Sequence, residues 1–163
     1  MKRATLLVAV GLTVLALAVG VALAIQPSGE TATPVTATPL TRATLGEFKA
    51  KNGNIQVKSL QQSADMAIVK VVIEPGGSTG WHHHPGVALV SVNSGAVTEY
   101  DKNCHKSVFK AGEGFVESNG EVHVVRNRGK ANAVLYVTFI APTKTPADGL
   151  VLLDPKPKGC NVK

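Results

Sequence analysis

The length, composition and charge of this chain limit what it can be before any motif is considered. Its 163 residues suffice for one domain and a leader, because a folded domain ordinarily takes about 100–200 residues. Loss of Lys2 and Arg3 with the leader would lower the formal net charge of +6 by two. The other basic residues are scattered, which indicates a solvated exterior rather than a surface for an anionic partner, and argues against a nucleic-acid partner.

Residues 1–24 predict export. Lys2 and Arg3 precede an uncharged apolar run over residues 4–23, and residues 22–24 (Ala-Leu-Ala) have the small-x-small pattern of a signal peptidase site. The run is longer than the usual ~7–15 residues of a signal peptide and long enough to span a bilayer. We therefore expect a signal peptide, with an N-terminal membrane anchor as the alternative. In both cases the domain is secreted or lies in the periplasm or cell envelope.

Residues 25–42 are expected to form a disordered linker. From residue 26 to residue 42 there are five Thr, three Pro and only two large aliphatic residues. Such a composition buries too little apolar surface to order the chain by itself. The folded domain is then predicted to cover residues 43–163.

Beyond residue 42, short apolar runs separated by Gly, Pro, Asn and Asp predict strands. The eight predicted strands are residues 55–60, 66–74, 87–92, 96–100, 107–110, 114–117, 122–127 and 133–140. The Asn-Ser-Gly sequence at 93–95 predicts a hairpin between two of them. No long apolar period of 3.6 residues is present, so the pattern predicts an all-β, closed or nearly closed antiparallel barrel.

Four histidines stand in a pattern that suits a metal site. His82, His83 and His84 are consecutive, and His123 follows in a later predicted strand. Alternate side chains of a strand share a face, so His82 and His84 point together and His83 points away. His123 can then supply a third imidazole from a neighbouring strand, and imidazole suits Zn, Cu, Ni and Fe(II). A surface histidine cluster without metal is the alternative.

The sequence around these histidines resembles the two motifs of the cupin family. The matching residues are Gly76-x5-His82-x-His84 with a later Gly95, and Gly112-x5-Ser118-x-Gly120-x2-His123-x3-Asn127. The whole of 44–160 is similar to small exported bacterial cupins, including the mid-chain Cys and the Pro-rich tail that ends in Cys. The resemblance implies a cupin-type jelly-roll β-barrel with a metal ion inside it. It also implies that Asn127 holds a turn by hydrogen bonds, and that a homodimer is an expected assembly.

Ser118 stands where proline is usual in the second motif, and one further departure bears on the metal site. Cupins usually carry a glutamate four residues after the second histidine, where this chain has Ala88. Without that carboxylate we expect a three-histidine site for Fe(II), Zn, Cu or Ni rather than Mn, with open coordination positions. The uncompensated double charge would favour a small anionic ligand.

Two glutamates near His123 are candidates for a fourth ligand. Glu121 shares the strand parity of His123 and is therefore the better of the two. Glu117 has a second possible role, which is to orient a ligand histidine from outside the metal's immediate ligands. Solvated side chains without a metal role are the alternative for both.

Cys104 and Cys160 are expected to form a disulfide. In an oxidising compartment a pair of cysteines indicates a bridge rather than two free thiols. The bridge would tie the C-terminal tail to a loop in the middle of the barrel.

Three classes of function stay open, and one of them is a structural or interaction role on the cell envelope, with the domain displayed on the Thr/Pro-rich linker; the other two are more specific. The first is a metal-dependent oxidoreductase of the dioxygenase type, acting on a small anionic substrate at His82, His84 and His123, with no separate catalytic acid or base evident. The second is a non-catalytic module of the cell envelope that binds a small ligand, which the loss of glutamate at Ala88 mildly favours.

Overall fold

A computed structural model of the chain describes residues 23–24, 35–59, 62–118 and 120–162. The expected signal peptide therefore lies outside the described residues except for its last two positions, as do residues 25–34 of the expected linker. Over the ranges that are described, no helix is long and apolar enough to cross a membrane.

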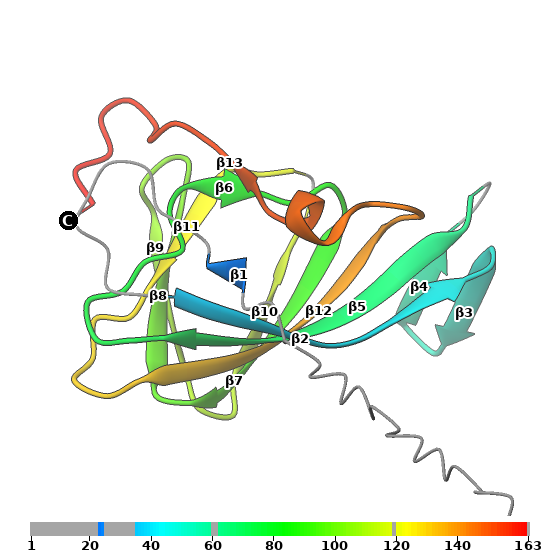
Figure 1. The fold of residues 1–163 in the computed structure, drawn as a ribbon, viewed down its shortest axis with the longest axis horizontal. Coiled ribbons are helices and arrows are strands. Elements are labelled where there is room, and N and C mark those ends of the chain that lie inside the picture. Colours follow the sequence, from blue (N-terminus) through cyan, green and yellow to red (C-terminus); the bar gives the residue numbers. More distant parts are fainter. Residues whose placement is uncertain (1–22, 25–34, 60–61, 119, 163) are drawn as a thin grey trace, which may run out of the picture.

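Antiparallel strands form nearly all of the regular structure (Figure 1). The larger sheet has the order β1 (Leu23–Ala24), β2 (Val35–Leu45), β5 (Ala64–Ile73), β12 (Ala133–Pro142), β7 (Val87–Ser94) and β10 (Gly114–Glu117). The smaller sheet has the order β13 (Leu152–Leu153), β6 (His82–His83), β11 (His123–Arg126), β8 (Ala96–Asp101) and β9 (Lys106–Lys110). A hairpin of β3 (Phe48–Asn52) and β4 (Ile55–Ser59) projects from this body, and a short 3-10 helix, η1 (Ala147–Leu150), precedes β13.

The main hydrophobic core lies between the two larger sheets. In β5 and β12 every second side chain is buried, as the alternation of a strand requires. Val97 of β8 and Val125 of β11 meet this core from the smaller sheet. Burial of a Val, Leu or Phe side chain contributes about 1.5–3 kcal/mol, so these alternating residues are the main stabilising feature of an all-β barrel.

All eight predicted strands are present, and none of their ends differs from the prediction by more than two residues. The prediction of a disordered linker over 25–42 is wrong for residues 35–42, which belong to β2. This strand pairs with β5 along its length, and Val35 and Ala37 are buried in the core. Pro39 is tolerated because the register shifts between Pro39 and Thr41, where a ladder hydrogen bond is not needed. The apolar surface that orders this segment comes from β5, which local composition does not reveal.

The predicted hairpin at residues 93–95 is also wrong. β7 pairs with β10 and β12, whereas β8 pairs with β9 and β11, so the chain changes sheets at this turn. Gly95 has a φ of 74°, and an added Cβ would lie 2.8 Å from the Asn132 carbonyl oxygen. The tight turn is therefore real, but the strands that it joins diverge.

Candidate metal centre

Three histidines converge inside the barrel from adjacent strands. His82 lies in β6 directly opposite His123 of β11, and His84 follows β6. The alternation expected from the sequence is observed: His82 and His84 are buried, while His83 is partly exposed and its Nδ1 lies 2.6 Å from Asp154 Oδ2. His82, His84 and His123 are each only 4–6% exposed.

The loop before β6 is held in place by Asn127. The Asn127 side chain is 1% exposed and donates hydrogen bonds to the carbonyls of Ile73 and Ala131. Its backbone N donates to the Gly77 carbonyl, and its own carbonyl accepts from Gly76 N. The structure therefore shows the hydrogen-bonding role that the resemblance implied for Asn127, and it fixes the approach of the chain to His82.

The rings of the three histidines are close enough to share one ion. Their centroids are 4.3 Å (His82–His123), 4.8 Å (His82–His84) and 5.2 Å (His84–His123) apart. Their available ligand atoms all lie within 4.8 Å of one another. Two nitrogens at about 2.1 Å from one ion are at most about 4.2 Å apart, so only a small closure of the rings is needed. The group can hold a metal ion.

Backbone carbonyls select the nitrogen that each ring presents. The Nδ1 atoms of His82, His84 and His123 lie 2.9, 2.7 and 2.8 Å from the carbonyl oxygens of Gly80, Leu150 and Glu121. A carbonyl only accepts, so each Nδ1 carries the proton and each neutral ring keeps its lone pair on Nε2. Such outer hydrogen bonds are what orient imidazole ligands at metal sites.

The carboxylate in the cluster belongs to Glu117, at the end of β10. Its Oε2 lies 3.0 Å from His84 Nε2 and its Oε1 lies 3.1 Å from His123 Nε2. Glu117 is directly opposite Ala88 of β7, and Ala88 is completely buried. Its side chain is thus found beside the position at which the motif lacks its glutamate.

Glu121, expected to be the better fourth ligand, does not reach the cluster. Its side chain is 59% exposed and its carboxylate lies 3.7 Å from Lys102 Nζ. Strand parity does not apply to Glu121 because β11 begins only at His123. Glu121 lies in a turn, and its backbone N–H donates a hydrogen bond to the Ser118 carbonyl. Only the backbone carbonyl of Glu121 contributes to the cluster, because it accepts a hydrogen bond from His123 Nδ1.

Burial and the Glu117 charge act in opposite directions on the cluster. Burial lowers the pKa of His82 to about 3, helped by the charges of His123 and His84. Burial would raise the pKa of Glu117, but its contacts with His123 and His84 outweigh this effect and lower that pKa to about 2. Burial would likewise lower the pKa of His123, and Glu117 raises it instead. The cluster at neutral pH therefore holds one fixed negative charge and a neutral His82.

The Nε2 atom of His123 lacks a partner that a buried nitrogen needs. Among the described residues it has no hydrogen bond, although Glu117 Oε1 is 3.1 Å away. Buried polar atoms are nearly always satisfied, and an exception in a native structure asks for an explanation such as an ion. A divalent ion between Nε2 and the carboxylate would satisfy both atoms. The donors present, three imidazoles and a carboxylate, fit a divalent transition-metal ion.

A cavity of about 550 Å³ opens onto the histidine cluster. His82, His84 and Glu117 line one part of it. Most of the remaining wall is apolar and includes Val69, Val90, Phe115, Leu135, Val137 and Phe139. The Val90 side chain faces inward and is 6% exposed. The arrangement is that of a small-molecule pocket, in which apolar walls surround a few polar groups.

Sequence reasoning missed two contributors to this region. Glu99 of β8 is opposite Val125, and its pKa is raised first by burial and then by the charge of Glu117. The carbonyl of Leu150, in η1, accepts a hydrogen bond from His84 Nδ1, and Leu150 lines the cavity. Strand parity with Val97 could have placed Glu99 on the inner face. No local signal places Leu150 beside His84, because that contact spans 66 residues.

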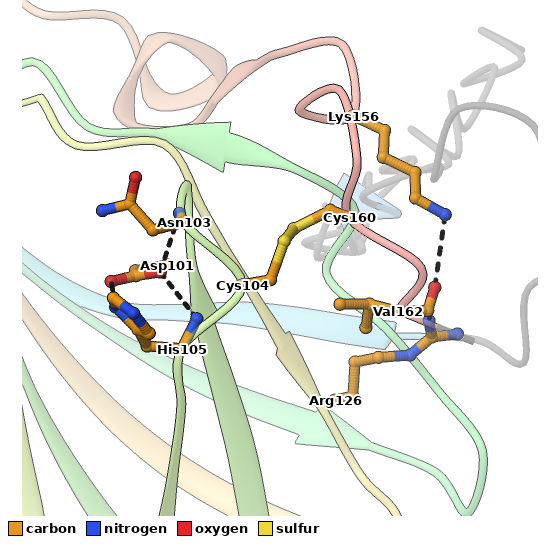
Figure 2. The surroundings of a disulfide bond; sticks show 8 residues. All are labelled: Asp101, Asn103, Cys104, His105, Arg126, Lys156, Cys160 and Val162. Carbon is orange, nitrogen blue, oxygen red and sulfur yellow. Dashed lines mark hydrogen bonds and ion pairs between the residues drawn. A yellow bond between two sulfur atoms is a disulfide. The ribbon is translucent and has the colours of Figure 1, made fainter.

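The structure contains the expected disulfide between Cys104 and Cys160 (Figure 2). Cys104 lies in the loop after β8, where Asp101 Oδ1 accepts hydrogen bonds from the backbone N atoms of Asn103 and His105. Cys160 packs in a second buried cluster with Trp81. Trp81 thus packs against the tail, and its carbonyl accepts a hydrogen bond from Asp154 N. The bridge therefore holds the tail against the segment that carries His82.

Comparisons with known proteins agree with this arrangement. A family model described as "Cupin domain" matches residues 69–139, a range that includes the three histidines and Glu117. A germin-like protein from Morus alba is 29% identical over 94 residues, which are 55% of this chain and 43% of that protein. The chain thus spans less than half the length of this relative.

Two solved structures are similar at low sequence identity. A cupin 2 conserved barrel domain protein from Salinispora arenicola is 16% identical, over 67% of this chain and 76% of that chain, with a TM-score of 0.48. A cupin-like protein from Thermotoga maritima is 19% identical, over 72% of this chain and 78% of that chain, with a TM-score of 0.47.

The fold and the histidine cluster define an all-β barrel with a group of potential metal ligands in its interior. The match to the family model falls on the strands and loops that build this group. The chain belongs to the cupin superfamily.

Proposed function

We propose that the chain is an exported, metal-dependent oxidoreductase of the dioxygenase type, which holds one divalent transition-metal ion on His82, His84 and His123. The observation that carries the proposal is the shared orientation of the three buried rings, whose Nδ1 atoms all face carbonyls and whose Nε2 atoms are left for an ion at the wall of a cavity. When bound, an ion with open positions supplies adjacent sites for a substrate oxygen and for dioxygen.

The cavity wall supports a particular kind of substrate. An anionic oxygen of a small molecule would be attracted to the ion, while the apolar side chains around it favour an apolar remainder. Arg42 also lines the cavity, but it is paired with Asp65. The proposed substrate is therefore a small molecule with one anionic, metal-binding head group and an apolar body.

The disulfide supports the exported location. Disulfides persist in oxidising compartments and are rare in the reducing cytosol. Cys104 and Cys160 pair in the structure, and within the described chain there is no free cysteine. The N-terminal sequence, with Lys2 and Arg3 before its apolar run, supports the same proposal.

A binding module without turnover is the second candidate. The observation that favours it is the scarcity of further acids and bases at the cavity: outside the metal cluster, its described ionisable wall residues are the paired Arg42 and the exposed Asp148. A binding protein needs no proton donor, whereas most oxidations need proton transfer at some step.

The test measures metal and turnover on the same preparations. Mature protein made in an oxidising compartment should contain close to one equivalent of a transition metal by elemental analysis, and a His82→Ala/His84→Ala variant should contain little. His105→Ala is the matched control, because His105 is 79% exposed and lies outside the cluster. Equal metal in wild type and double variant would refute the site.

Oxygen uptake with a panel of carboxylates and enolates, measured at matched protein concentration, separates the two candidates. Uptake that disappears in the double variant and persists in His105→Ala supports the oxidoreductase. Saturable ligand binding without uptake supports the binding module.

A further inference from the structure

We propose that Glu117 is a fourth protein ligand to the metal ion, supplied from the strand beside the one on which the family motif places its glutamate. This inference rests on the proposed metal site and adds a residue to it. It replaces the expectation of a purely three-histidine site with an uncompensated double charge.

The direction of the Glu117 side chain is the first argument. Along β10 the side chains of Phe115 and Glu117 face inward and line the cavity, while Val116 is 61% exposed. Glu117 itself is 7% exposed. A carboxylate is costly to bury without a cation or several donors, so its inward position needs a partner inside the barrel.

The atoms that Glu117 faces are the second argument. A carboxylate that merely orients a ligand histidine accepts the proton of the nitrogen remote from the metal. Those remote nitrogens are already bonded to the carbonyls of Gly80, Leu150 and Glu121. Glu117 instead has one oxygen on the Nε2 of His84 and the other on the Nε2 of His123, the atoms left for the ion. It therefore lies on the metal's side of both rings.

The incomplete hydrogen bonding of the cluster is the third argument. A His84 ring bonded to both Glu117 and the Leu150 carbonyl would have to carry two protons, since both partners only accept. His123 Nε2 approaches the other carboxylate oxygen without forming a hydrogen bond. One divalent ion in place of the protons would satisfy all these atoms together.

Space at position 88 is the fourth argument. Ala88 faces Glu117 on one side and Phe139 on the other, and all three side chains are buried. A longer side chain at position 88 would compete with Glu117 for the same volume, because interiors are close-packed. Ala88 on β7 and Glu117 on β10 are therefore complementary in size. We expect that exchanging the two residues preserves the site.

The exchange gives a sharp experiment. We would measure the affinity for Co(II) by chelator competition, with the Co(II) absorption spectrum as a second readout, in wild type, Glu117→Gln, Glu117→Ala and Glu117→Ala/Ala88→Glu. Glu121→Gln is the matched control, since it makes the same chemical change on a side chain that is 59% exposed. Circular dichroism and free-thiol titration confirm that each variant is folded with its disulfide intact.

We expect Glu117→Gln and Glu117→Ala to bind Co(II) more than ~100-fold more weakly, beyond the usual effect of a residue outside the metal's ligands, with an altered spectrum. The exchange variant should recover most of the affinity and the wild-type spectrum, and Glu121→Gln should match wild type. Recovery distinguishes a ligand from a residue that only stabilises the barrel.

Two results would overturn the proposal in different ways. An unchanged Co(II) spectrum and affinity in Glu117→Gln, together with lost binding in His84→Ala, would remove Glu117 from the metal's ligands and leave the three-histidine site intact. Absence of Co(II) binding in wild type would overturn both this inference and the proposed function.

Discussion

The cluster around Asp65 and the histidine cluster, both in the part of the chain that the structure describes, differ in how completely their hydrogen bonds are made. Asp65 of β5 is 4% exposed and accepts hydrogen bonds from the Arg42 side chain, from Thr44 Oγ1 at 2.7 Å and from Lys144 N at 3.0 Å. In the histidine cluster the Glu117 carboxylate meets two Nε2 atoms, and that of His123 has no hydrogen bond among the described residues.

The difference indicates which cluster is structural and which is functional. A carboxylate with a complete set of donors fixes β2 against β5 and the chain after β12 without needing anything further. A cluster in which a buried nitrogen has no hydrogen bond can gain the missing interaction from a ligand. Changes to the two clusters should therefore separate stability from metal binding.

The largest expected effect concerns the disulfide between Cys104 and Cys160 (Figure 2). Cys104→Ala/Cys160→Ala removes a bridge between residues 56 apart in sequence, for which the chain-entropy model gives up to about 4 kcal/mol of unfolding free energy. Urea denaturation of metal-free protein should show a lower midpoint, with a steeper slope because the unfolded chain without the bridge exposes more surface. An unchanged midpoint would mean that the tail is held by Trp81 and the β13–β6 pairing alone.

The next effect separates the two clusters by metal addition. A metal ion at about 100 times its dissociation constant should raise the free energy of unfolding by about 2.7 kcal/mol, because it binds only the folded state. We expect the same increment in Asp65→Asn, although that variant starts from a lower stability, and no increment in His123→Ala. Thermal unfolding with and without Zn(II) checks this. An increment lost in Asp65→Asn would show that the clusters are coupled.

Much of the barrel follows from the sequence because its strands carry local signals. The alternation in β5 and β12 and the Gly-rich turns between strands place the eight predicted strands within two residues of their observed ends. The segment of β2 was not recoverable in this way, because its Thr and Pro composition is typical of a linker and its order comes from pairing with β5. The hairpin prediction at residues 93–95 failed for the same reason, because a turn sequence does not say whether the strands that it joins will pair.

The site was predictable where it depends on strand alternation and not where it depends on register between strands. His82, His84 and His123 could be placed from their spacing and from the resemblance, and the structure brings them together. That Glu117 rather than Glu121 lies in the cluster could not be predicted. It follows from the start of β11 at His123 and from the pairing of Glu117 with Ala88. Pairing is a tertiary property, so the residue nearest in sequence was the wrong carboxylate.

The smallest effect is the pH dependence of the Asp65 cluster. The hydrogen bond from Arg42, followed by that from Thr44, lowers the pKa of Asp65 below its ordinary 3.8, against the effect of burial. A carboxyl whose folded pKa is lowered contributes stability that is present above its unfolded pKa and is lost as the pH falls through the folded pKa. The melting temperature of wild type should therefore exceed that of Asp65→Asn at pH 6, and the gap should close as the pH falls below about 4. Calorimetry of both metal-free proteins from pH 6 to pH 3 measures this gap. A gap that stayed constant over this range would show that Asp65 acts through packing rather than through its charge, and the contrast between the two clusters would then rest on the histidines alone.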